Sequence, residues 1–220
     1  MHKMKIKHHN QLPKVSLSII INRFSRPSMT KEDKSYFEGV EEKTHAAAYN
    51  SNSEKRPPVR FSNGIVYEGS WRGDLREGYG VQIWPDGARY EGYWINNKAN
   101  GRGKFIHVDG DIYDGEWKND KASGKGTYYH NNGAKYEGEW LDDQQHGYGV
   151  ETWVDGSKYE GYYNMSRKNG RGKYVWRDGS YYDGDWVDNK ITGRGIYIWS
   201  DGRKYEGEWL NNQMHGRGKY

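Results

Sequence analysis

Cysteine is absent from this chain of 220 residues. Neither a disulfide framework nor a thiolate metal site can therefore form, and a reducing compartment is favoured. No stretch reaches the roughly 18 consecutive apolar residues that a membrane-spanning helix requires. Hydrophobic residues make up only 33% of the chain, which is too little to fill the core of an ordinary globular domain of this length.

Aromatic residues and glycine are abundant instead. Aromatic residues make up 15% of the chain, and there are 30 glycines. Disordered chains are poor in aromatic side chains, so this composition favours an ordered fold. Because Tyr and Trp combine a large apolar ring with one polar group, they predict a thin structure with an amphipathic aromatic core.

Charge is unevenly distributed along the chain. Residues 1–60 hold 12 Lys/Arg and 6 Asp/Glu, a net charge of +6, whereas residues 61–220 hold 22 and 24, a net charge of −2. The nearly neutral second part offers no basic surface for nucleic acid, and we expect no nucleic-acid partner. Residues 1–31 contain seven Lys/Arg and no acid, so they are the part that could contact an anionic membrane.

A motif of tyrosine, an acid and glycine recurs every 23 residues from position 67 to position 205, without insertion. Two positions after this glycine stands an aromatic residue, which is Trp in six copies and Tyr163 in the fifth. A Gly-x-Gly follows in every copy, and Asp-Gly or Asn-Gly closes each of the first six. Seven copies in phase predict a repeat protein over residues 61–220.

Each repeat has the spacing of a β-hairpin. Tyr67, Gly69 and Trp71 are two residues apart, so they share one face of a strand. The same holds from Gly78 to Trp84, and a loop around Arg72–Glu77 would join the two strands. An Asp-Gly or Asn-Gly turn then leads to the next hairpin.

The opposite face is predicted to be charged. If Trp71 lies opposite Gly78 within the hairpin, position 70 faces position 79. In later copies this places Asp185 beside Arg194, as a cross-strand ion pair.

The parity of the strands gathers the aromatic side chains on one face, where the interleaved glycines leave room for rings to lie over bare backbone. A large aromatic face is a candidate interaction surface if nothing covers it. Its members are Tyr67, Trp71, Trp84, Tyr90, Trp94, Tyr113, Trp117, Tyr136, Trp140, Trp153, Tyr159, Trp176, Tyr182, Trp186, Trp199, Tyr205 and Trp209.

Two segments closely resemble the consensus of the MORN repeat family: YEGEWLDDQQHGYG at Tyr136–Gly149 and YEGEWLNNQMHGRG at Tyr205–Gly218. The resemblance covers Tyr67–Tyr220. It implies an all-β fold, an elongated single-layer antiparallel array of β-hairpins. Tyr163 departs from the family's tryptophan, so we expect the fifth repeat to pack less tightly.

The resemblance also implies a function. It points to a non-catalytic scaffold that binds protein partners in a larger cytoplasmic assembly, cytoskeletal or ciliary in the manner of an axonemal radial spoke. The alternatives are a membrane or phosphoinositide adaptor, and an accessory module or subunit of an enzyme complex, including a mitochondrial one.

Residues 1–60 form an N-terminal extension without visible repeats. Val15–Asn22 alternate in the manner of a strand, and Thr30 before Lys31-Glu32-Asp33 is typical of a helix start, with the helix reaching about Ala48. A polar linker is expected over Asn50–Pro58. The basic, acid-free residues 1–31 are also compatible with mitochondrial targeting.

No residue set predicts catalysis, a cofactor or a metal. The Gly-x-Gly pairs sit within strand patterns and lack the helix start and Lys-Ser/Thr of a phosphate loop. His107 and His130 share a repeat position, but one repeat is about 10 Å long, too far for one zinc ion. The carboxylates follow the repeat, and none stands apart as an acid–base pair.

Overall fold

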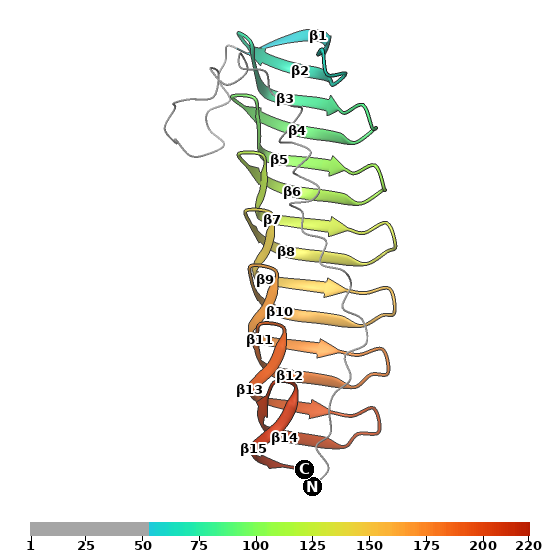
Figure 1. Cartoon of the computed structure of the whole chain (residues 1–220), viewed down its shortest axis with the longest axis vertical. Coiled ribbons are helices and arrows are strands. Elements are labelled where there is room, and N and C mark those ends of the chain that lie inside the picture. The colour runs from blue at the N-terminus through green and yellow to red at the C-terminus, as the bar shows by residue number, and fades with distance from the viewer. Residues whose placement is uncertain (1–52) are drawn as a thin grey trace. The chain divides into compact units, whose positions relative to one another are not determined.

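The computed structural model describes residues 53–220. These residues form one antiparallel sheet whose hydrogen-bonded order follows the sequence from β1 to β15, with no helix in the described part (Figure 1). The all-β prediction is confirmed, while the strand and helix predicted before residue 50 lie outside the described residues. The strands are β1 (Glu54–Arg60), β2 (Val66–Arg72), β3 (Leu75–Ile83), β4 (Arg89–Ile95), β5 (Lys98–Ile106), β6 (Ile112–Lys118), β7 (Lys121–Tyr129), β8 (Lys135–Leu141), β9 (Gln144–Thr152), β10 (Lys158–Asn164), β11 (Arg167–Val175), β12 (Tyr181–Val187), β13 (Lys190–Ile198), β14 (Lys204–Leu210) and β15 (Gln213–Lys219).

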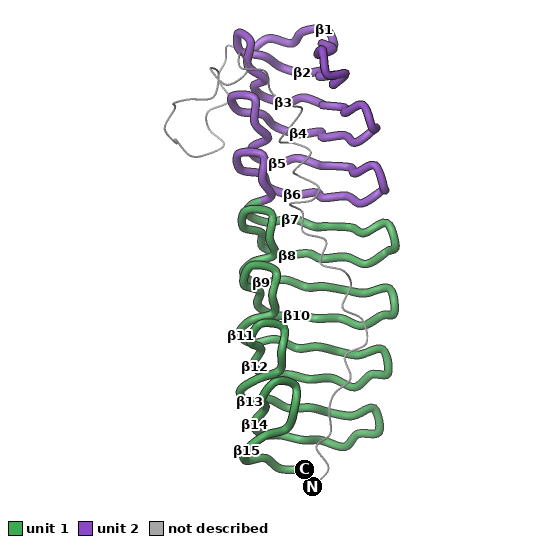
Figure 2. The backbone as a smooth tube through the Cα atoms, viewed as in Figure 1, with its two compact units in different colours: residues 1–15, 123–220 green, residues 16–122 purple. Residues whose placement is uncertain are grey.

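The described residues fall into two compact units, and the boundary lies inside β7 (Figure 2). Unit 2 contains described residues 53–122, with β1 to β6. Unit 1 contains residues 123–220, with the rest of β7 and β8 to β15. Within each unit, successive strands are joined by turns of a few residues, as the hairpin pattern predicts.

The turn inside each hairpin is tighter than the predicted six-residue loop. In the second repeat it consists of Asn96 and Asn97 alone, both in the left-handed region with φ of 49° and 67°. Two positive φ angles suit the right-handed twist of the strands on either side, and Asn and Asp adopt them at low cost. The pair of Asn or Asp residues is therefore the sequence signal for this two-residue turn, in which glycine is the usual residue with positive φ.

The register within a hairpin contains a bulge that periodicity alone did not predict. Between β8 and β9, Gly138 pairs with Gly149, but the next pair is Glu139 with His146. The same shift places Trp71 opposite Arg76, not opposite Gly78 as predicted, and Gly78 instead faces Trp94 of the next hairpin. The physical cause is the positive φ of the first glycine of each Gly-x-Gly, 81° at Gly78, which interrupts the regular pairing.

The bulge also changes the predicted pair of Asp185 and Arg194. Asp185 does lie beside Arg194, but its carboxylate accepts a hydrogen bond from the Arg194 backbone N–H at 2.9 Å. The Arg194 guanidinium lies 3.9 Å from the Glu208 carboxylate of the following hairpin instead. The acid thus stabilises the bulge, and the ion pair links one repeat to the next.

Strand β1 occupies most of the predicted linker. Residues 61–65 behind it repeat the turn of the later copies: the Phe61 N–H donates to the Ile65 carbonyl at 2.9 Å, as the Trp84 N–H does to the Ala88 carbonyl. Residues 54–66 therefore correspond to the second half of a repeat that lacks the consensus motif. The signal in the sequence is Asn63-Gly64, which stands 23 residues before Asp86-Gly87.

Candidate interaction surfaces

The aromatic residues predicted as an interaction face form the core of the two units. Fourteen of the seventeen are buried, and only Trp84, Trp176 and Trp199 are half-buried. A partner could reach these three, whereas the remainder pack against one another. The accessible part of the predicted interaction face is therefore limited to these three tryptophans, which share one repeat position at the rim of the core.

The core is a ladder of edge-to-face ring contacts that crosses the repeat boundaries. In unit 2, the Tyr67 ring lies 5.1 Å from Trp71 of its own repeat and 5.5 Å from Trp94 of the next, nearly perpendicular to both. In unit 1, Tyr182 contacts Trp186 and Trp209 in the same way. Such contacts stabilise beyond the area they bury, so each repeat supplies part of its neighbour's core.

Each core tyrosine also lies over the glycines of its hairpin. A Cβ at Gly172 would overlap the Tyr159 hydroxyl, so only glycine fits there. The Tyr159 hydroxyl donates to the Tyr162 carbonyl at 3.1 Å, a bond that recurs at all seven copies. Burial raises the pKa of Tyr67 to about 12, because the phenolate would lose its hydration.

The core tryptophans are hydrogen-bonded to the preceding hairpin. In unit 1 the Trp186 Nε1–H donates to the Gly172 carbonyl at 3.0 Å, and four other tryptophans make the equivalent bond. Trp71 is the exception, because its Nε1 is buried without a partner among the described residues. The residue at the acceptor position is Pro57, where the pairing of β1 with β2 is irregular.

The turn of each hairpin is bound to the second strand of the hairpin before it. In unit 2 the Asn97 N–H donates to the Arg76 carbonyl at 3.1 Å, and the Asn97 side-chain oxygen accepts from the Arg76 N–H at 2.8 Å. The Asn96 N–H donates to the buried Glu77 carboxylate at 3.0 Å. The two Asn97 bonds recur at Asp120, Asn189 and Asn212.

The junction between β9 and the turn of β10 and β11 has fewer of these bonds. Met165 and Ser166 form this turn, with φ of 47° and 61°. The Ser166 N–H donates to the Gln145 carbonyl at 2.8 Å, but the serine hydroxyl is too short to reproduce the second bond. His146 stands where Glu77 does, and its buried Nδ1 atom has no hydrogen-bond partner in the part of the chain that the structure describes.

Tyr163, the replacement for tryptophan in this repeat, lies in a polar cluster. Its hydroxyl donates to the Glu151 carboxylate at 2.9 Å, and Lys168 Nζ lies 3.1 Å from the same carboxylate. The Lys168 ammonium also lies 4.9 Å from the ring centres of Trp153 and Tyr159. Tyr163 is nevertheless buried, and its ring lies 5.3 Å from Tyr136 and 5.2 Å from Tyr159, as the tryptophan rings of other repeats do. The looser packing expected for the fifth repeat therefore stays a prediction.

The other face of the sheet carries rows of charge. Each of four acids lies beside a base two residues earlier in the same strand, with N···O distances of 2.7–3.0 Å: Arg89–Glu91, Lys135–Glu137, Lys158–Glu160 and Lys204–Glu206. Exposed pairs of this kind contribute little to stability. This face is therefore available for contacts with other molecules at small energetic cost.

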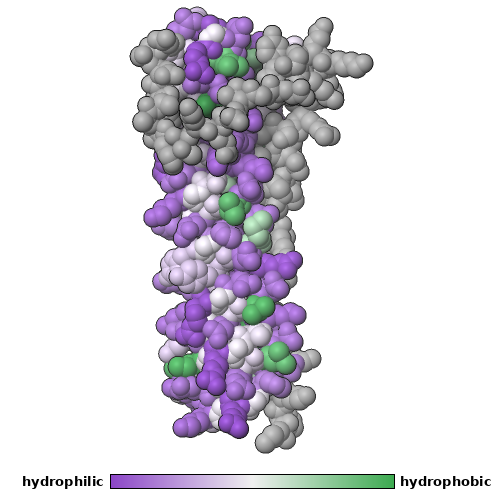
Figure 3. Space-filling view, turned by 90° about the vertical axis from the view of Figure 1, so that its left-hand side faces the viewer, coloured by the Kyte–Doolittle hydropathy of each residue, from purple (hydrophilic) through white to green (hydrophobic). Residues whose placement is uncertain are grey.

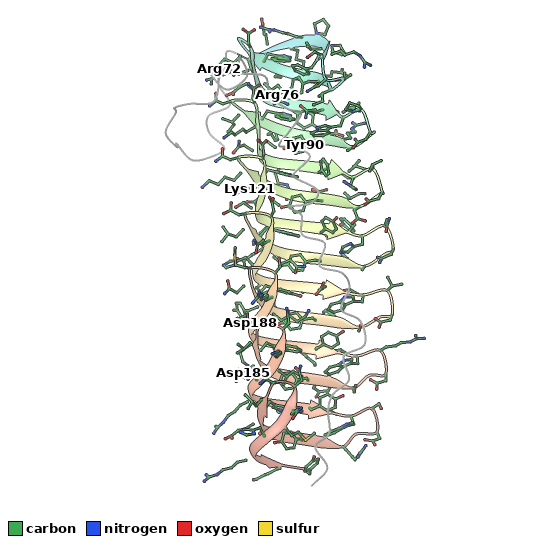
Figure 4. All side chains as sticks on the ribbon, viewed as in Figure 1. Arg72, Arg76, Tyr90, Lys121, Asp185 and Asp188 are labelled. Atoms are coloured by element: carbon green, nitrogen blue, oxygen red, sulfur yellow. The ribbon has the colours of Figure 1, made fainter. Side chains whose placement is uncertain are left out.

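The edge with the hairpin turns presents isolated apolar side chains. Ile95 in unit 2, and Leu141, Val187 and Leu210 in unit 1, are 40–46% exposed. Figure 3 views this side and shows single hydrophobic residues among hydrophilic ones, and Figure 4 labels Arg72, Lys121 and Asp188 along it. Single exposed apolar residues are ordinary on protein surfaces, so this edge is a weaker candidate than the charged face.

Within residues 53–220 there is no group of three or more His, Asp or Glu side chains placed to hold a metal ion. The same residues contain no helix that could cross a membrane.

A family model described as the MORN repeat matches seven times, at residues 67–89, 90–112, 113–135, 136–158, 159–181, 182–202 and 205–220. The chain belongs to the MORN repeat family. The seven matches confirm the repeat number and the 23-residue period derived above. MORN is a non-enzymatic type of repeat. No curated protein matches this MORN chain.

Two solved structures are similar to the MORN chain at low sequence identity. One is the TCP domain of SAS-4 of Drosophila melanogaster, in complex with a proline-rich motif of Ana2, with 14% identity, a TM-score of 0.36, and coverage of 84% of this chain and 97% of that one. The other is the TCP10 domain of Danio rerio CPAP, with 14% identity, a TM-score of 0.31, and coverage of 76% and 96%. Similarity at this level carries no inference about function.

Proposed function

We propose that this MORN protein is a non-catalytic scaffold that binds protein partners in a larger assembly. The observation that carries the proposal is the charged face of the sheet, where exposed tyrosines such as Tyr148 and Tyr162 stand among arginines and acids. Tyr and Arg are enriched at the centres of protein interfaces, and rigid tyrosine rings give contact area at low entropic cost. The buried aromatic side chains support this face from the other side of the sheet and would not themselves contact a partner.

The test is crosslinking of the tagged full chain in cells, followed by purification and identification of its neighbours. Recovery of defined protein partners supports the scaffold. Cytoskeletal or ciliary neighbours would identify the assembly we favour, and mitochondrial neighbours would move the scaffold to that compartment. Recovery of a monodisperse monomer without partners under native conditions would contradict the proposal.

A further inference from the structure

The charged face carries the same cluster of side chains twice, three repeats apart. The clusters are Tyr79, Tyr93 and Arg102 in unit 2, and Tyr148, Tyr162 and Arg171 in unit 1. At the repeat positions that Tyr79 and Tyr93 occupy, most other copies have charged residues, such as Lys125 and Glu139. The paired tyrosines are therefore not part of the repeat's consensus and need another explanation.

The cluster in unit 1 is held rigidly. The Tyr148 and Tyr162 rings lie 5.5 Å apart at an interplanar angle of 77°, and the Tyr148 hydroxyl donates to Glu160 at 2.7 Å. The two tyrosines are 42% and 51% exposed. Arg171 follows Gly170 on β11, where a Cβ at Gly170 would lie 3.4 Å from the Tyr162 Cβ, and its guanidinium reaches Asp183 and Asp185 of β12.

The cluster in unit 2 has the same geometry. The Tyr79 and Tyr93 rings lie 5.4 Å apart at 80°, and the Tyr79 hydroxyl donates to Glu91 at 2.7 Å. The hydrogen bond to Glu91 raises the pKa of Tyr79 to about 12. Tyr79 is 47% exposed, and the Arg102 side chain is 64% exposed. The two tyrosine pairs therefore share their ring geometry and their acid partner, although Tyr93 is half-buried where Tyr162 is exposed.

We propose that the two clusters are equivalent docking sites, each for one extended, proline-containing segment with an acidic residue, so that one chain binds two such segments. This inference rests on the proposed scaffold function and names the chemistry of its partner.

The spacing of the side chains within each cluster favours a polyproline II segment. Tyr79, Tyr93 and Arg102 lie on three successive strands, β3, β4 and β5, so the first and the last are about 10 Å apart. A polyproline II segment advances about 3.1 Å per residue with three residues per turn, so residues i and i+3 point the same way about 9 Å apart. A proline ring on the outer tyrosine of the pair, Tyr79 in unit 2, therefore brings an acid three residues along to the arginine.

Charge supports the acidic residue. Arg171 lies 3.5 Å from Asp185 and 3.6 Å from Asp183, with a side chain 63% exposed. Arg102 is similarly exposed and lies 3.3 Å from Asp114. Exposed ion pairs of this kind are weak, so a carboxylate of the partner can compete for the exposed side of each guanidinium.

The test is isothermal titration of the full chain with a synthetic peptide that contains Pro-Pro-Ala-Glu, and with a matched Pro-Pro-Ala-Lys peptide. We expect two equivalent sites for the glutamate peptide and at least about tenfold weaker binding of the lysine peptide. Tyr79→Ala and Tyr148→Ala should each leave one site, and the double variant none. The control is Tyr129→Ala, an equally exposed tyrosine (45%) on the same face, which should keep both sites.

A charge-reversal variant distinguishes a loss of binding from a failure to fold. Arg171→Glu should lose one site for the glutamate peptide and gain one for the lysine peptide, which a misfolded variant could not do. A stoichiometry other than two, no binding of the glutamate peptide, or loss of a site in Tyr129→Ala would overturn the proposal. If defined partners are still crosslinked to the double tyrosine variant, the scaffold function stands and the two clusters are not its sites.

Discussion

At the scale of single residues, the contact between tyrosine and glycine fixes the backbone of each hairpin. We expect Gly172→Ala to destabilise the protein by about 2–3 kcal/mol, since the new methyl group would overlap the Tyr159 ring. Gly179→Ala is the comparison, because a Cβ there meets nothing within 4 Å and only the φ of 83° is unfavourable, at about 1–2 kcal/mol. Urea unfolding of both variants measures the difference. Equal losses would contradict a steric role for Gly172.

The indole hydrogen bond can be measured at the same scale. Trp186→Phe removes the bond from Nε1 to the Gly172 carbonyl, whereas Trp71→Phe removes a buried donor that has no partner within residues 53–220. Both changes shrink the ring equally, so we expect Trp186→Phe to cost about 1–2 kcal/mol more in unfolding free energy. A larger loss in Trp71→Phe would show that this indole has an acceptor.

At the scale of the element, the turn at Met165 and Ser166 makes fewer bonds to the preceding hairpin than the turns at Asn97, Asp120, Asn189 and Asn212. Replacing both by Asn should stabilise the protein by about 1–2 kcal/mol, because Asn tolerates the left-handed conformation and can restore the side-chain bond to the Gln145 N–H. Amide hydrogen exchange in β9 and β10 should slow by the corresponding factor.

The reverse change provides the matched control for that turn. Asn211→Met with Asn212→Ser transfers the same two residues to a turn that makes both bonds, including Asn212 to the Ile191 N–H at 2.7 Å. It should destabilise the protein by a similar amount. If neither pair of substitutions changes exchange or stability, the turns do not determine the strength of the junctions.

Much of the element pattern could be predicted from the sequence. Strand parity placed Tyr67 and Trp71 on one face, and the 23-residue period gave the hairpin order. The bulge could not be predicted, because it depends on the positive φ of glycines such as Gly78, which composition does not reveal. Most of strand β1 was predicted as a polar linker. Its Pro57 and Pro58 are compatible with a strand because β1 lies at the edge of the sheet, where prolines are tolerated.

The candidate site was less predictable than the fold. Parity tells which side chains share a face, but not whether rings of consecutive hairpins cover one another, as Tyr67 and Trp94 do. The aromatic residues were therefore predicted as a surface although most are core. The paired tyrosines Tyr79 and Tyr148 were visible in the sequence only as departures from a charged repeat position.

At the scale of the whole molecule, the core tyrosines predict a sharp alkaline limit of stability. Burial raises the pKa of Tyr67 to about 12, and it raises the pKa of Tyr136, Tyr159 and Tyr182 as well. A folded pKa above the unfolded value of about 10 means that this stability is fully present below pH 10 and is lost as the pH rises through about 12.

Absorbance of tyrosinate and circular dichroism, followed together from about pH 9 to pH 13, test this prediction. We expect a late phase of tyrosinate formation to coincide with loss of the strand signal. Complete ionisation of all tyrosines before the strand signal changes would show that the core rings are accessible to hydroxide in the folded protein.

The bonds between each turn and the preceding hairpin have a consequence for length. Since they recur at 23-residue steps, removal of residues 182–204 would join Tyr181 to Tyr205 and leave each remaining repeat with a neighbour of the same kind. The chain can therefore become longer or shorter in steps of 23 residues. Duplication or deletion of one 23-residue unit in the gene can therefore change the number of repeats in a single step.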